Sequence, residues 1–191
     1  MNSETLRNVR LFESLDKREL DALSELTFVR TFEKDNVIIW AEDKGDALFI
    51  IADGKVKVSI VSEDGREVIL SLLSKNAVFG ELSLLDGRPR SANVIAIEET
   101  QLVMLRRADF LELIQKTPSI AVALLAELAS RLRKTDRQIE GLALLDVASR
   151  ISDTLLQLAI EQGVESNSGI VVENRPTHQE IANMSGTTRE T

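Results

Sequence analysis

The sequence contains no cysteine and only one histidine, His178. Without cysteine the chain forms no disulfide, no thiolate zinc site, no iron–sulfur cluster and no cysteine nucleophile. A single histidine also argues against a multi-histidine metal site, haem ligation and a histidine-dependent catalytic triad. These absences argue against metal, redox and nucleophilic chemistry, and we expect no metal, haem or iron–sulfur cofactor.

Long apolar runs are absent as well. No stretch approaches the roughly 20 apolar residues of a membrane span, and the N-terminus has no apolar run of the signal-peptide type. We therefore expect a cytoplasmic protein with no membrane partner. The net charge of −8 argues against a broadly basic nucleic-acid surface, although a local one remains compatible with it. At 191 residues the chain is long enough for two small domains.

The first part of the chain changes from a helical to a strand-like pattern. Residues 1–26 read as helical, with leucines at helical intervals and capping-box spacing between Asp16 and Glu19. From residue 28 to 107 the period changes to two, with close turn signals such as Asp53-Gly54. The candidate strands are residues 37–40, 47–52, 55–61, 67–73, 93–97 and 101–105. The pattern predicts an antiparallel roll or barrel, with the N-terminal helices as a cap on a sheet.

One stretch, residues 79–92, interrupts the strands and has the parts of an anion site. Gly80 opens a short apolar helix whose N-terminal N–H groups and dipole favour negative charge. Arg90 offers a charge-assisted contact to phosphate, and Ser91 offers a hydroxyl donor. Glu81 would be repelled by a phosphate, but it suits a sugar hydroxyl. The alternative is a surface loop with a solvated arginine.

A short helix over residues 108–116 is followed by a much longer one that Pro118 opens. Along the long helix a narrow stripe recurs at intervals of 4, 3, 4 and 3 residues, which is typical of a two-stranded coiled coil and predicts a homodimer. Its members are Leu128, Leu132, Thr135, Ile139 and Leu142. The alternative is a helix packed on its own domain. Gly141 and the N-cap candidate Asp146 indicate a hinge between them.

The last part of the chain begins with an amphipathic helix that ends at Gly163, followed by a turn-rich loop over residues 163–169 and a strand over 170–172. Thr177 and Glu180 then form a second capping box, Gly186 supplies a turn, and a second helix is expected from Thr187. This is the first half of a helix-turn-helix, although similar helix pairs occur without a DNA role. Residues 175–191 carry no net charge to hold a phosphate backbone.

Taken together, these motifs resemble the Crp/Fnr family of cyclic-nucleotide-responsive bacterial transcription regulators over nearly the whole chain. The order is specific: a roll, a phosphate-binding stretch, a dimerisation helix ending in Leu-Ala-Leu-Leu-Asp-Val, and a helix-turn-helix containing Arg-Glu-Thr. The resemblance implies an α+β fold with a jelly-roll-like β-roll. It implies a nucleotide-binding domain over residues 1–116, a dimerisation helix and hinge over 117–145, and the start of a winged helix-turn-helix over 146–191.

The resemblance also implies roles for particular residues. Arg90 and Ser91 would hold the cyclic phosphate, Glu81 would accept the ribose hydroxyl, and Thr135 would lie near the base edge. The effector would be a cyclic nucleotide, with cyclic AMP the first choice, and there would be no catalytic residue. The implied ligand-binding set is Gly80, Glu81, Leu82, Arg90, Ser91, Ala92, Arg131, Thr135 and Asp136.

For DNA, the resemblance implies that Arg189 and Glu190 read base edges, with Thr177 and His178 near the DNA backbone. RNA polymerase would be the downstream partner. Family members continue through a recognition helix and a wing, so we expect that this polypeptide is truncated and binds DNA weakly or without specificity.

The chain departs from the family pattern at Asp136, where the catabolite activator has a hydroxyl residue. A carboxylate there can accept from the N1–H and N2–H₂ groups of guanine, so cyclic GMP or cyclic di-GMP is an alternative effector. The plain alternative is a solvated surface charge. A ligand-independent regulator and a cupin-like enzyme are further alternatives. Cupin chemistry usually needs metal-binding histidines inside the barrel, and residues 28–107 contain none, so we do not expect an enzyme.

Overall fold

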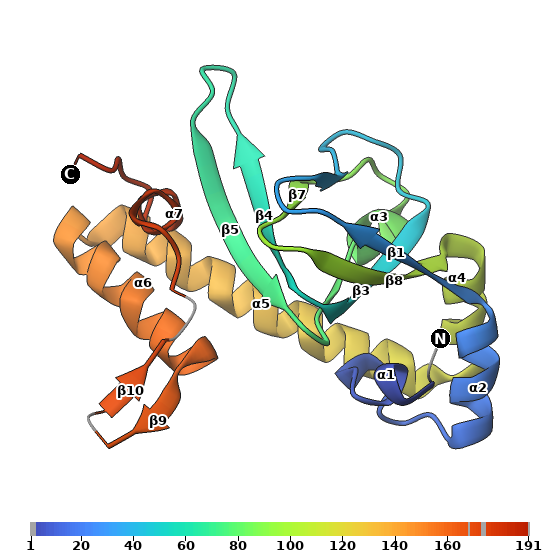
Figure 1. The fold of residues 1–191 in the computed structure, drawn as a ribbon. Helices are drawn as coiled ribbons and strands as arrows, with labels where there is room; N and C mark the ends of the chain where they lie inside the picture. The colour runs from blue at the N-terminus through green and yellow to red at the C-terminus, as the bar shows by residue number, and fades with distance from the viewer. Residues whose placement is uncertain (1–2, 168, 173–174, 191) are drawn as a thin grey trace. The chain divides into compact units, whose positions relative to one another are not determined.

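The structure is a computed structural model that describes residues 3–167, 169–172 and 175–190 (Figure 1). The chain divides into two compact units. The first unit comprises Met1–Ile60 and Leu70–Ala129, and the second comprises Val61–Ile69 and Ser130–Thr191. The long helix α5 (Pro118–Leu144) contributes residues to both units.

The first unit contains two four-stranded sheets, and the residue pairings between their strands are antiparallel. One sheet has the order β1 (Thr27–Phe32), β8 (Thr100–Arg106), β3 (Ala47–Asp53) and β6 (Val78–Phe79). The other has the order β2 (Val37–Ile39), β7 (Asn93–Ala96), β4 (Lys55–Val61) and β5 (Glu67–Ser74). The prediction of an antiparallel roll is confirmed. The outer part of the β4–β5 hairpin, Val61–Ile69, is counted with the second unit.

Strand β3 shows how the sequence builds the core of the first unit. Successive side chains of a strand point to opposite faces. Accordingly Leu48 and Ile50 lie in one buried cluster, whereas Phe49 and Ile51 lie in another. The second cluster joins β3 to residues of the other sheet such as Val94. Since both faces of β3 are buried, its sequence is an almost continuous apolar run.

The helices of the first unit pack on the sheet that contains β3. Their buried side chains share a cluster with Leu48 and Ile50 of that strand. They are α1 (Ser3–Arg7), a 3₁₀ turn (Arg10–Phe12), α2 (Lys17–Glu25), α3 (Glu81–Asp86), α4 (Arg107–Lys116) and the start of α5. The side chain of Asp16 accepts from the Glu19 N–H at 2.9 Å, and Glu19 accepts in return from the Asp16 N–H at 2.8 Å. The predicted capping box and the predicted helical cap are both confirmed.

The second unit consists of the end of α5, α6 (Val147–Gln162), β9 (Val164–Ser166), β10 (Gly169–Val171) and α7 (His178–Met184), together with the hairpin segment. The Asp146 carboxylate accepts from the Ser149 N–H at 2.8 Å and begins α6, as predicted. Thr177 and Glu180 form the predicted capping box at the start of α7. Across the described part of the chain, no helix is both long enough and apolar enough to cross a membrane.

One expectation for the second unit is wrong. Residues 163–169 are not simply a loop, because β9 and β10 pair there as a hairpin and the Ser166 hydroxyl donates to the Gly169 carbonyl at 2.8 Å. Residues 187–190 form a bend and a turn, and the helix expected from Thr187 stays a prediction. The Thr187 N–H bonds back to the Ala182 carbonyl at 3.0 Å, so Thr187 closes α7. Thr191, the last residue of the Arg-Glu-Thr motif, lies outside the described residues.

Candidate functional site

The stretch from 79 to 92 folds as a short helix between two left-handed glycines. Strand β6 ends at Phe79, Gly80 follows with φ +83°, α3 (Glu81–Asp86) forms, and Gly87 ends it with φ +72°. A Cβ atom at Gly80 would lie 2.7 Å from Arg90 Nη1. Glycine at position 80 thus gives α3 its direction and leaves room for the arginine.

Arg90 is the central side chain of this stretch, and it is only 5% exposed. Its Nη1 donates to the Gly80 carbonyl at 2.6 Å and its Nη2 to the Ala47 carbonyl at 2.8 Å. The guanidinium also lies over the Phe49 ring, with Cζ 5.6 Å from the ring centroid. A guanidinium has five N–H donors, so two bonds orient it without using its full capacity. The structure therefore holds Arg90 in a fixed orientation at the start of α3.

The loop before β3 holds the backbone of Arg90 as well. The Arg90 N–H donates to the Asp43 carbonyl at 2.8 Å, and the Glu42 N–H donates to the Arg90 carbonyl at 2.9 Å. Gly45 lies so close that a Cβ atom there would come 3.1 Å from Arg90 Cζ and 2.4 Å from Ser83 Cβ. In the sequence this loop shows only turn signals between two predicted strands. Its contacts use backbone atoms, which leave no signature in residue types apart from the close-packed Gly45.

Burial and nearby carboxylates act on Arg90 in opposite directions. Burial lowers the pKa of Arg90, while the carboxylates of Asp46, Glu81 and Asp43 favour its charged form. An arginine remains charged at neutral pH even when its pKa falls somewhat. A cation that has lost much of its water is a strong partner for an anion that reaches it. The site is therefore suited to a ligand with one negative charge beside a group that can donate to a carboxylate.

The other predicted residues of the first unit lie around Arg90 in the sequence and differ in exposure. Glu81 is buried at 3% exposure in the first turn of α3, and Ala92 is buried too. Ser91 is exposed, and Leu82 is about half exposed. The burial of Glu81 beside Arg90 favours a specific role for its carboxylate over that of a solvated surface charge.

The predicted residues on the long helix lie in the second unit. Arg131, Thr135 and Asp136 belong to α5, and Thr135 and Asp136 are exposed. The Thr135 hydroxyl donates to the Arg131 carbonyl one turn earlier at 3.1 Å. Their part in ligand binding stays a prediction.

The predicted coiled-coil stripe is largely exposed on α5. Leu132 is 62% exposed, and Ile139 and Leu142 are similarly open to solvent. Leu128 differs, because it packs against the buried cluster of the first unit. Leu125, three residues before Leu128, is exposed and extends the stripe by one position at the same spacing, which the sequence prediction did not include.

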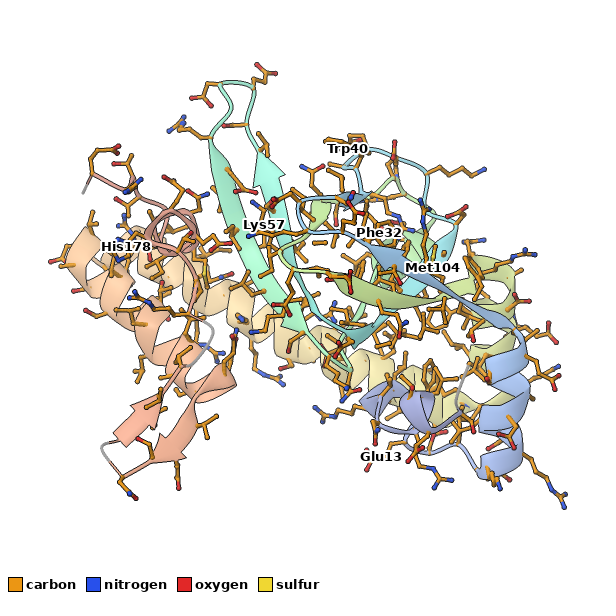
Figure 2. The ribbon with its side chains drawn as sticks, in the orientation of Figure 1. Glu13, Phe32, Trp40, Lys57, Met104 and His178 are labelled. Atoms are coloured by element: carbon orange, nitrogen blue, oxygen red, sulfur yellow. The ribbon has the colours of Figure 1, made fainter. Side chains whose placement is uncertain are left out.

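The residues predicted to contact DNA lie around α7. Thr177 and His178 are exposed at the N-terminal end of that helix, where Figure 2 labels His178. Arg189 and Glu190 are exposed in the final turn. His178 and Arg189 both line a cavity of about 390 Å³, with apolar side chains of α6 and α7 such as Leu158 and Ala182. Contact with DNA stays a prediction.

The structure has a β-roll that carries a buried arginine, together with a helical segment, and comparisons with known proteins identify the family of this domain. Residues 29–117 match the cyclic nucleotide-binding domain family. The cyclic AMP receptor protein of Thermus thermophilus is 37% identical over 181 residues, which cover 95% of this chain and 81% of that protein. A global nitrogen regulator of a Nostoc species is 34% identical over 165 residues, covering 85% of this chain and 74% of that protein.

The fold has solved counterparts. The c-di-GMP responsive global regulator CLP of Xanthomonas campestris superposes with a TM-score of 0.77 over 92% of this chain and 87% of that one. Its sequence identity is 23%, so this likeness concerns the fold alone. The chain belongs to the Crp/Fnr family of transcription regulators and carries that family's cyclic nucleotide-binding domain.

Proposed function

We propose that the protein is a homodimeric transcription regulator switched by a cyclic nucleotide, with cyclic AMP as the effector, and that it is not an enzyme. Arg90, Ser91 and backbone N–H groups at the start of α3 bind the cyclic phosphate, and Glu81 accepts the ribose hydroxyl. On the family pattern, Arg131 and Thr135 of α5 close over the nucleotide, with Thr135 near the base edge, and Asp136, where the chain departs from that pattern, could accept from a guanine base. In this proposal residues 1–116 bind the nucleotide, residues 117–145 form the dimer helix and hinge, and residues 146–191 begin the DNA-binding domain.

One observation carries the proposal: Arg90 is buried and held by the Gly80 and Ala47 carbonyls next to the buried Glu81. A buried cation with no carboxylate at hydrogen-bonding distance lowers the stability of the fold. Such a cost is typical of a side chain that binds a ligand. The described ion pairs of the chain join other side chains, so no salt bridge accounts for the position of Arg90. A cyclic phosphodiester supplies the single negative charge that this position suits.

Calorimetric titration of the protein with cyclic AMP, cyclic GMP and cyclic di-GMP tests the proposal. We expect one cyclic AMP per protomer, bound more tightly than either guanine nucleotide. A higher affinity for cyclic GMP or cyclic di-GMP than for cyclic AMP would identify a guanine nucleotide as the effector. No heat from any of the three would favour the ligand-independent alternative.

Asp136 provides a separate test of base selection. Its carboxylate can accept from two guanine donors, and a hydrogen bond to a charged group contributes about 1.5–3 kcal/mol. We therefore expect Asp136→Ser to weaken cyclic GMP relative to cyclic AMP by about tenfold, which corresponds to roughly 1.4 kcal/mol. The same titration measures this ratio. An unchanged ratio would return Asp136 to the role of a solvated surface charge.

The exposed stripe on α5 supports the homodimer. Its leucine and isoleucine side chains recur at the spacing that buries them between two parallel helices. We expect Ile139→Glu, which places a charge in the centre of the stripe, to convert the dimer to a monomer in sedimentation velocity. Leu156→Glu on α6 is a matched control, because Leu156 and Ile139 are 58% and 59% exposed. A monomeric wild type, or a dimer that survives Ile139→Glu, would contradict this interface.

The remaining partners follow from the family. We propose that Thr177 and His178 approach the DNA backbone, that Arg189 and Glu190 read bases, and that RNA polymerase is the downstream partner. Guanidinium groups pair with guanine, and carboxylates accept from cytosine. The neutral charge balance of residues 175–191 supplies little phosphate attraction, so we expect weak DNA binding by these 191 residues, measured by fluorescence anisotropy. Nanomolar, sequence-specific binding would contradict this expectation.

A further inference from the structure

Arg150 makes a set of contacts that the proposed nucleotide site does not use. It lies in the first turn of α6, and its side chain reaches backbone carbonyls at two separate places in the second unit. Nη1 donates to the Leu145 carbonyl at 3.0 Å. Nε donates to the Ser185 carbonyl at 2.9 Å, and Nη2 reaches the Gly186 carbonyl at 3.4 Å. We call these three bonds the hinge–turn bridge.

The acceptors of the bridge are the ends of two helices. Leu145 follows the last residue of α5, and Ser185 and Gly186 follow the last residue of α7. Carbonyls at a helix C-terminus have no partner within the helix, and the helix dipole gives that end partial negative charge. One guanidinium therefore satisfies and neutralises both ends together. Its planar fork can serve several acceptors at once, which a lysine ammonium on a flexible stem does less well.

Two further contacts bring the same segments together. The Ser185 hydroxyl lies 3.0 Å from the Thr154 hydroxyl of α6, and Ser185 is buried. Gly186 has φ +62°, and a Cβ atom there would lie 2.9 Å from Leu142 Cδ2 of α5. The turn after α7 thus packs closely on the end of α5, and glycine permits both the backbone conformation and the close approach.

From these contacts we infer that Arg150 is a positioning residue that couples the end of α5 to the turn after α7. The chain between α5 and α6 has only Leu145 and Asp146 outside helix, so a change in the direction of α5 acts first at the Leu145 carbonyl. Arg150 transmits that displacement directly to Ser185 and Gly186. The inference rests on the proposed function for the identity of the signal, a cyclic nucleotide, but the bridge itself is a property of the second unit.

Removal of the three Arg150 bonds should leave the packing of α7 on α6 in place. Leu158 of α6 and Ala182 of α7 are buried, and the three bonds of the bridge involve neither residue. In Arg150→Met, which keeps most of the apolar stem, α7 should therefore stay packed on α6. Arg150→Lys keeps the charge but reaches fewer carbonyls, so we expect an intermediate effect. Arg18→Ala is the control, because it too removes one guanidinium, here an exposed one on α2 of the first unit.

The experiment combines calorimetry with amide hydrogen exchange followed by NMR, using cyclic AMP as the probe. In the wild type and in Arg18→Ala, cyclic AMP should change the exchange of residues 142–146 and 182–187 together. In Arg150→Met, the affinity for cyclic AMP should stay within about threefold, the response at 142–146 should persist, and the response at 182–187 should be lost. A full response at 182–187 in Arg150→Met would overturn the coupling role, even if that variant were less stable.

Measurements without nucleotide separate the bridge from the proposed effector. The Leu145 N–H bonds to the Gly141 carbonyl, the Ser185 N–H to the Ile181 carbonyl and the Thr187 N–H to the Ala182 carbonyl. Loss of the bridge should speed the exchange of all three amides by about tenfold or more, since bonds to charged groups are among the stronger ones. If the wild type binds no cyclic nucleotide, the proposed function fails. The exchange rates measured without nucleotide still test whether Arg150 holds the two helix ends together. Unchanged exchange at these amides would overturn this role of Arg150.

Discussion

Arg90→Ala should weaken the binding of cyclic AMP by about 100-fold or more, which corresponds to roughly 3 kcal/mol. The side chain supplies the buried positive charge of the site, and its orientation is fixed in advance by bonds to Gly80 and Ala47. The ligand therefore meets a charge that needs no reordering, so little of the interaction is offset by lost side-chain freedom. Isothermal titration of the two proteins with cyclic AMP measures the loss directly.

Arg88→Ala is the matched control for this experiment. Arg88 lies two residues earlier, its side chain is 85% exposed, and its Nε is 4.0 Å from Asp86 Oδ2 at the surface. A surface pair of this kind contributes little, so Arg88→Ala should bind cyclic AMP as the wild type does. Arg90→Lys should recover only part of the affinity, because an ammonium does not reproduce the planar fork. Equal affinities of the wild type and Arg90→Ala would remove Arg90 from the site.

Gly80→Ala should reduce both stability and nucleotide affinity. The positive φ alone costs roughly 1–2 kcal/mol with any ordinary side chain. In addition, the new methyl group would lie 2.7 Å from Arg90 Nη1, 3.2 Å from Phe49 Cδ2 and 3.3 Å from the Ala47 carbonyl oxygen. The guanidinium would have to leave its bonded position to make room. We expect a loss of cyclic AMP affinity of at least tenfold, measured by titration beside thermal unfolding.

A variant of Gly87, which follows α3, distinguishes the cost of the backbone conformation from the steric displacement of Arg90. Gly87 has a similar φ of +72°, but a Cβ atom there would meet nothing within 4 Å. Gly87→Ala should therefore show the backbone cost in thermal unfolding and keep its affinity for cyclic AMP. If the two variants lost the same affinity, backbone strain in α3 would explain the effect, and the displacement of Arg90 would not.

The sequence predicted those elements whose residues carry their own local signal. Strand β4 was predicted at its observed bounds, and the capping boxes at Asp16 and Thr177 fix the starts of α2 and α7. Two strands of the roll were missed for physical reasons. The residues of β1 are mostly exposed and lack alternation, and β6 has only two residues, which is too short for a period.

Contacts made through backbone atoms could not be predicted from the sequence. The pattern singled out Arg90, but nothing in it indicated that the Ala47 carbonyl would hold its side chain or that the loop from residue 42 would hold its backbone. The hinge–turn bridge was missed for the same reason, since Arg150 bonds only to carbonyls, which every residue possesses.

The central claim is that the β-roll binds a cyclic phosphodiester, and a titration of the wild type with cyclic AMP and with 5′-AMP tests it most directly. A cyclic phosphodiester carries one negative charge, whereas a phosphate monoester carries about 1.5 to 2 at pH 7. One buried guanidinium beside the carboxylates of Glu81, Asp43 and Asp46 suits the single charge better. We expect one cyclic AMP per protomer, and 5′-AMP at least about tenfold weaker, a difference of roughly 1.4 kcal/mol. Equal binding of the two nucleotides, or no binding of cyclic AMP, would contradict the claim.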